Sequence, residues 1–144
     1  MKLPTILLIA IATSSCWIAN AADDVAWTAL AGYKTKIAII SEGPAGNPTV
    51  EAKDTVTVHA TGIVKESNKK FWSTKDAGQQ PFTYTAGIGG VITGWDQGCL
   101  GMQIGETRKL VIPAHEGYGA NGFPAWGIPP GGTLDFTLEC LSIQ

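Results

Sequence analysis

Glycine and proline interrupt this chain so often that a fold built from long helices is disfavoured. There are 18 glycines and 8 prolines among 144 residues, and both residue types favour tight turns. The segments between them are short and alternate apolar with polar residues, as strands do. The length suffices for one domain. We therefore expect a single β-rich domain.

The clearest strand is predicted over residues 55–64. Val56, Val58 and Ala60 fall on one face of it, while threonine and histidine residues fall on the other. Successive side chains of a strand point to opposite faces, so this pattern indicates a half-buried strand. Similar but less regular patterns predict further extended segments over 33–39, 71–72, 82–84, 106–112 and 133–143.

One short helix is predicted after the glycine pair at 89–90. Trp95, Cys99 and Met102 are spaced by four and three residues, which places them on one helix face. Thr93 is expected to cap the helix, with Asp96 three residues later in an arrangement close to a capping box. Two glycines weaken this helix, so packing must stabilise it.

The first 21 residues have the features of a secretory signal peptide. Lys2 is their only charged residue, an apolar run covers residues 6–12, and Ala19-Asn20-Ala21 fits the cleavage pattern. That run is too short to span a bilayer, and a buried core segment is the alternative interpretation. We expect cleavage near Ala22, a lead-in over 22–32, and a domain over 33–144 in the endoplasmic reticulum lumen or outside the cell. No membrane association is expected after cleavage.

Cys99 and Cys140 remain once the leader is removed. An oxidising compartment permits such a pair to form a disulfide. Both residues also occupy apolar-face positions, where cysteine serves as a small buried hydrophobe. The sequence leaves both alternatives open.

Several classes of function are disfavoured by charge and motifs. The net charge is −2 and the lysines are dispersed, unlike the basic surface of a nucleic-acid-binding protein. His59 and His115 have no close ligand partners in sequence, so no metal site is expected. Residues 87–90 lack the Gly-Lys-Ser/Thr ending of a phosphate loop, and no nucleophile elbow occurs. We expect a binding protein, or an enzyme whose reaction needs neither covalent chemistry nor a cofactor.

Four blocks of residues follow one another along the chain: VHATG at 58–62, PFTY at 81–84 with GVITGW at 90–95, GETR at 105–108, and YG at 118–119 with IPP at 128–130 and TLDF at 133–136. In these blocks the chain resembles the FKBP family of peptidyl-prolyl cis-trans isomerases, in a secretory form. The resemblance implies an α+β fold, with a curved five- to six-stranded antiparallel sheet wrapped around one short α-helix. It also implies an enzyme that accelerates the rotation of Xaa-Pro bonds in proline-containing polypeptide clients. A non-catalytic module that binds proline-containing segments is the alternative. The sequence shows no added dimerisation helix or repeat domain, so we expect a monomer.

The family's pocket can be transferred to this chain residue by residue. Trp95 would form its floor, while the Ile92 amide and the Tyr118 hydroxyl would donate hydrogen bonds to substrate carbonyls. The implied catalytic residues are Tyr118, Phe136, Trp95 and Phe71. The implied substrate-binding residues are Phe82, Val91, Ile92, Ile128, Trp72 and Ala60.

Two of these positions depart from the family's pattern. Ala60 stands where the family usually has tyrosine, and Trp72 stands where it usually has aspartate. The two changes roughly conserve volume, so the Trp72 ring is expected above Ala60, with a surface position as the alternative. An indole donates a hydrogen bond but cannot accept one as a carboxylate does. Binding of macrolides of the rapamycin type is therefore expected to be weakened. The segment 123–127 is also longer than the family's usual spacing.

Overall fold

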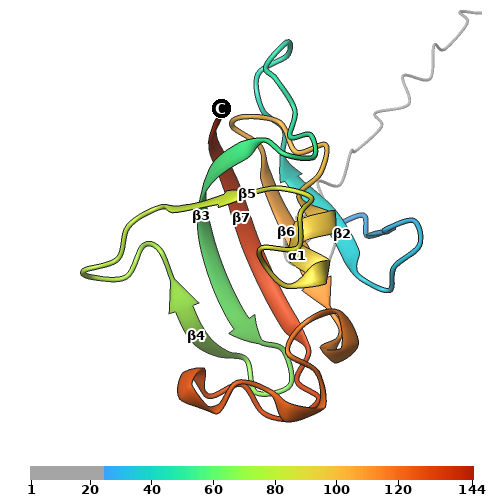
Figure 1. The fold of residues 1–144 in the computed structure, drawn as a ribbon, viewed down its shortest axis with the longest axis vertical. Coiled ribbons are helices and arrows are strands. Elements are labelled where there is room, and N and C mark those ends of the chain that lie inside the picture. Colours follow the sequence, from blue (N-terminus) through green and yellow to red (C-terminus); the bar gives the residue numbers. More distant parts are fainter. Residues whose placement is uncertain (1–24) are drawn as a thin grey trace, which may run out of the picture.

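An antiparallel sheet bends around one short helix in the computed structural model, which describes residues 25–144 (Figure 1). The predicted signal peptide over 1–21 and the start of the lead-in lie outside the described residues. The strands are β1 (Thr28–Ala29), β2 (Lys36–Ser41), β3 (Thr55–Val64), β4 (Lys69–Ser73), β5 (Phe82–Thr85), β6 (Thr107–Ile112) and β7 (Leu134–Ile143). The predicted fold class is confirmed. The seventh strand, β1, was not expected, because two residues are too few to show an alternating pattern.

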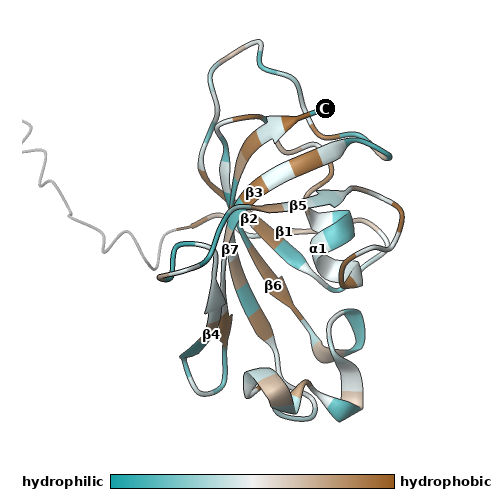
Figure 2. Ribbon diagram, turned by 60° about the vertical axis from the view of Figure 1, so that its left-hand side comes forward, coloured by the Kyte–Doolittle hydropathy of each residue, from teal (hydrophilic) through white to brown (hydrophobic). Residues whose placement is uncertain are grey.

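Strand β3 is central, because three other strands pair with it. The sheet order is β1-β2-β6-β7-β3-β4. Strand β7 runs along one edge of β3, while β5 and β4 share the other edge, beside residues 55–58 and 61–64 respectively. The predicted alternation along β3 is confirmed, since every second residue from Val56 to Val64 is buried. Figure 2 shows apolar and polar residues alternating along the strands, with the helix against one face of the sheet.

The helix α1 (Thr93–Gly98) lies on the inner face of the sheet, close to β6. A Cβ at Gly94 would lie 2.5 Å from Cγ2 of Ile112, so glycine permits this close approach. Trp95, Cys99 and Met102 are buried as predicted, although α1 ends at Gly98 and the last two follow it. No helix within residues 25–144 is long and apolar enough to cross a membrane.

The start of α1 differs from the prediction. Ile92 occupies the N-cap position, Thr93 is already helical, and no side chain caps the helix. Asp96 is buried, and its carboxylate accepts hydrogen bonds from the amides of Gly87 and Gly89 at 2.8 and 3.0 Å. A buried carboxylate requires such donors, and the loop before the helix supplies two of them. Asp96 therefore fixes this loop onto α1 instead of completing a capping box.

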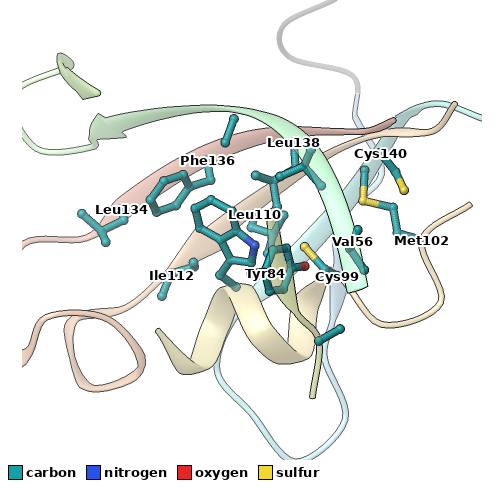
Figure 3. Close-up of a cluster of buried hydrophobic side chains, with 14 of the residues drawn as sticks. Val56, Tyr84, Cys99, Met102, Leu110, Ile112, Leu134, Phe136, Leu138 and Cys140 are labelled. Atoms are coloured by element: carbon teal, nitrogen blue, oxygen red, sulfur yellow. The ribbon is translucent and has the colours of Figure 1, made fainter. Parts of the chain in front are cut away.

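Cys99 and Cys140 are free thiols in the core (Figure 3). Burial raises the pKa of Cys99 to about 12 and that of Cys140 to about 11. The sequence left open whether the two cysteines form a disulfide or serve as small buried hydrophobic side chains, and the structure shows the second arrangement.

The segment between β6 and β7 contains three short 3₁₀ turns, η1 (Ala114–Glu116), η2 (Gly119–Asn121) and η3 (Pro124–Trp126). Glu116 anchors this segment, because its carboxylate accepts from the amides of Lys34 and Thr35 at 2.7 and 3.0 Å and from the Thr35 hydroxyl at 2.8 Å. Burial alone would raise the pKa of Glu116, but these hydrogen bonds and the neighbouring His115 together lower it. The same contacts explain why β2 begins at Lys36 rather than at residue 33. The preceding amides bind Glu116 instead of a neighbouring strand.

Candidate functional site

A cavity of about 210 Å³ opens between the inner face of the sheet, the start of α1 and the segment between β6 and β7. Its walls therefore come from regions that are far apart in sequence. The lining residues are Trp72, Phe82, Gly90, Val91, Ile92, Trp95, Tyr118, Trp126 and Phe136. None of them is charged, and five are phenylalanine or tryptophan.

Trp95 and Phe136 are the two aromatic residues of the cavity that are almost fully buried. The position of Trp95 on α1 directs its ring toward the sheet, and only 5% of the residue is exposed. The ring centroid lies 5.0 Å from that of Phe136 on β7 and 5.7 Å from that of Phe82 on β5. Trp95 thus forms the floor of the cavity, and the rings of Phe136 and Phe82 pack against it.

A bulge in β4 places two consecutive aromatic residues near the cavity. The pairing changes from Gly62 with Trp72 to Ile63 with Lys70, which leaves Phe71 without a partner on β3. In a regular strand Phe71 and Trp72 would point to opposite faces. Here the Phe71 ring meets Phe136 edge-on at 5.6 Å, and the Trp72 ring lies 6.2 Å from Trp95.

The ring of Trp126 was missed by the sequence interpretation. It stacks on Trp72 with a centroid distance of 6.0 Å and an interplanar angle of 10°, and on Phe71 at 6.1 Å and 21°. It belongs to the turn η3, where no strand or helix pattern predicts a direction for the side chain. The only sequence feature that could have indicated a role for Trp126 was the presence of aromatic residues in the unusually long segment 123–127.

Among the residues that line the cavity, Tyr118 alone carries a side-chain hydroxyl group. The residue is partly buried, and this burial raises the pKa of its hydroxyl above the usual value near 10. The group therefore stays protonated at neutral pH and can donate a hydrogen bond. Its ring lies 5.3 Å from that of Phe123.

Seven of the ten predicted site residues line the cavity, and the structure adds Gly90 and Trp126 to them. The other three lie behind the lining. Phe71 contacts Trp126 and Phe136, while Ile128 and Ala60 are each 1% exposed and belong to the core. Trp72 faces the cavity, so the alternative surface position is excluded.

Neither histidine faces the cavity. His59 bonds through Nδ1 to the Thr74 hydroxyl at 2.9 Å, and His115 lies 3.1 Å from Glu116. Within residues 25–144, no three His, Cys, Asp or Glu side chains converge to hold a metal ion.

Residues 46–141 match the family model of FKBP-type peptidyl-prolyl cis-trans isomerases. The chain belongs to this family. It is 52% identical over 103 residues to "Peptidyl-prolyl cis-trans isomerase FKBP12" of Arabidopsis thaliana, which covers 70% of this chain and 92% of the relative. The protein of the same name from Vicia faba is 51% identical over 108 residues, covering 74% and 95%. An "FK506-binding protein" of Neisseria meningitidis serogroup B is 48% identical over 99 residues, covering 68% and 86%.

These similarities identify the chain as a peptidyl-prolyl cis-trans isomerase, so the alternative of a non-catalytic module is not adopted. FKBP-family proteins bind proline-containing substrates, and they also bind macrolides such as FK506 or rapamycin. Six of the nine residues that line the cavity around Trp95 are aromatic.

Proposed function

We propose that this FKBP-type isomerase accelerates Xaa-Pro rotation in folding polypeptides of the secretory pathway by enclosing the bond in a water-poor aromatic cavity. The cavity itself is the supporting observation. Its nine lining residues carry no charge, and its floor is the indole of Trp95.

The physical argument starts from the amide bond. Its partial double-bond character produces a barrier to rotation of roughly 18–20 kcal/mol. Resonance also places charge on the oxygen and nitrogen atoms, and twisting removes that resonance. The twisted amide is therefore less polar than the planar one. A dry apolar cavity favours the twisted form, which is preferential binding of the transition state.

Hydrogen bonds hold the flanking chain in this proposal. The Tyr118 hydroxyl and the Ile92 amide donate to carbonyl groups of the substrate, while Phe136 and Trp95 surround the proline ring. These contacts keep the bound segment in a turn-like shape that favours rotation. The protein supplies orientation and exclusion of water, and no proton needs to be transferred.

Phe136→Ala tests this mechanism. Removing the ring opens the cavity to water, so kcat/KM for an Ala-Leu-Pro-Phe peptide is expected to fall. Leu138→Ala is the matched control, because Leu138 is equally buried on β7 but does not line the cavity. Each large-to-small change costs about 2–5 kcal/mol of stability. An unchanged kcat/KM in folded Phe136→Ala, or equal losses in both variants, would refute the role of Phe136.

The secretory location is supported by the sequence of residues 1–21. We expect the full chain, expressed in a eukaryotic cell, to be cleaved near Ala22 and recovered from the lumen or the medium. Ala21→Arg should block cleavage, because small residues are required at this site. Recovery of the uncleaved wild-type chain from the cytosol would contradict the proposal.

Weak binding of rapamycin follows from Trp72. Its indole replaces a hydrogen-bond acceptor, and its ring occupies space beside Trp95 and Trp126. Calorimetry should show weak binding by the wild-type chain and tighter binding by the variant Trp72→Asp with Ala60→Tyr. Tight binding by the wild-type chain would contradict this.

We also expect the chain to sediment as a monomer in sedimentation velocity.

A further inference from the structure

Trp126 and Phe123 form an aromatic corner at the rim of the cavity. Their rings lie 5.1 Å apart and are nearly perpendicular, at 72°. Trp126 is 42% exposed and Phe123 is 37% exposed. Large aromatic side chains are usually more buried than this, so the corner offers unusual apolar surface to a partner.

The corner is continuous with the cavity. Trp126 both lines the cavity and forms one side of the corner. Phe123 contacts Tyr118, whose ring also lines the cavity. A polypeptide with its proline above Trp95 has to leave the cavity over its rim. Its neighbouring side chains therefore come within reach of the corner.

The corner is also held in a fixed shape. The Phe123 amide donates to the Ile128 carbonyl at 2.9 Å, and the Ile128 amide donates to the Phe123 carbonyl at 3.1 Å. Ile128 is itself buried in the core. This small bridge ties the turn η3 to the body of the domain. A preformed site binds with a smaller loss of conformational entropy than a flexible one.

The segment that carries the corner favours an aromatic guest over a basic one. Residues 117–132 include no Asp, Glu, Lys or Arg. A basic side chain would find no carboxylate in this segment to pair with, whereas a ring can form stacked or edge-on pairs with both members of the corner.

We propose that Phe123 and Trp126 form a second subsite that binds an aromatic side chain located two or three residues from the isomerised proline. The spacing follows from the ring separations. The Trp72 ring lies 6.2 Å from that of Trp95 and 6.0 Å from that of Trp126, and the guest ring would pack directly against Trp126. An extended residue advances the chain by about 3.3–3.6 Å, so two or three residues together with the length of the guest side chain cover this path. This inference rests on the proposed binding of proline in the cavity.

A set of alanine-based peptides with one proline tests the subsite. A single phenylalanine is moved from the third position before the proline to the third position after it, and kcat/KM is measured by NMR exchange. With the wild-type chain, phenylalanine at one of the positions two or three residues away should raise kcat/KM about three- to tenfold over the all-alanine peptide, as expected for an aromatic pair. Trp126→Ala and Phe123→Ala should each bring this ratio close to one.

Trp27→Ala is the matched control, because Trp27 is 43% exposed and does not line the cavity. It should keep the wild-type ratio. A gain confined to the residue next to the proline, or a gain that persists in both corner variants, would overturn the subsite. These outcomes are distinct from failure of the cavity mechanism, which is tested on one fixed peptide with Phe136→Ala.

Discussion

Replacing Gly62 with alanine tests whether the aromatic wall depends on close contact across β3 and β4. The backbone φ of Gly62 is not among the positive values in this structure, so glycine is needed there for space rather than for its conformational freedom. A Cβ at this position would lie 2.7 Å from Cε2 of Phe71 and 2.8 Å from Cε1 of Phe136, and nearer still to Cζ of Phe71. One methyl group therefore meets two rings of the site.

The size of the effect follows from these distances. Carbon atoms rest at about 3.5–4.0 Å from one another, so both rings have to move by roughly 1 Å. Overpacking of this kind costs about 1–3 kcal/mol of stability. A displacement of about 1 Å in a site reduces activity by as much as 100-fold. We expect a loss of about tenfold in kcat/KM, since Phe136 lines the cavity whereas Phe71 lies behind it.

Urea unfolding followed by tryptophan fluorescence gives the stability, and a protease-coupled assay gives kcat/KM. Phe71→Leu, alone and combined with Gly62→Ala, is the control. The smaller side chain removes the ring atoms that the new methyl group meets, so the double variant should be more stable than the sum of the two single changes predicts.

Two results would refute this reasoning. Wild-type stability and kcat/KM in Gly62→Ala would mean that the rings move without cost. Strictly additive losses in the double variant would mean that the methyl group does not act on Phe71.

Three further predictions concern ionisable groups. The pKa of Glu116 is lowered in the folded chain, so its contribution to stability is present above its unfolded pKa near 4.5 and is lost as the pH falls. In Glu116→Gln the free energy of unfolding should therefore decrease less steeply as the pH is lowered. An unchanged dependence on pH would contradict this. The pKa of Cys99 is raised to about 12 and that of Cys140 to about 11, so stability should fall as the pH rises above the unfolded value near 9. The free energy of unfolding should decrease by up to about 1.4 kcal/mol per pH unit for each thiol. Guanidinium unfolding at pH 8–10.5 should show a smaller decrease for Cys99→Ala than for the wild-type chain. An equal decrease would count against burial of the thiol as the cause. Asp96→Asn keeps only one of the two hydrogen bonds, because Gly87 and Gly89 bind different carboxylate oxygens and the new NH2 group cannot accept from an amide. The amide left without an acceptor costs about 1–3 kcal/mol. The variant should raise KM and speed amide exchange in residues 87–90, and protected amides with a wild-type KM would contradict the role assigned to Asp96.

The sheet was predictable where one face of a strand is buried. In β3, Val56, Val58 and Ala60 alternate with polar residues because one side meets the core and the other meets solvent. The burial of Trp95 and Cys99 was predictable for the same reason, from spacing on a helix face.

Side chains that bind backbone groups elsewhere in the fold could not be predicted from spacing. Asp96 has the sequence position of a capping residue, yet its carboxylate binds two amides of the preceding loop. Glu116 carries no local signal at all, because its donors at Lys34 and Thr35 are more than 80 residues away. Such contacts are set by the packed fold.

The aromatic wall was only partly predictable. The family resemblance placed Trp72 near the proline site, but the bulge that turns Phe71 and Trp72 the same way has no sequence pattern of its own. Trp126 lies in a turn whose direction depends on the Phe123–Ile128 bridge. Its place between the cavity and solvent therefore emerged only from the three-dimensional arrangement.

The pairing of β3 with β7 has a consequence for when this enzyme becomes active. Strand β7 contributes Phe136 to the cavity, and its partner β3 begins some 80 residues earlier in the chain. Contacts this distant in sequence form late and slowly. A ribosome-bound chain that has not yet released β7 therefore lacks one side of the cavity. The cavity in which the isomerase acts is complete only after β7 has paired with β3.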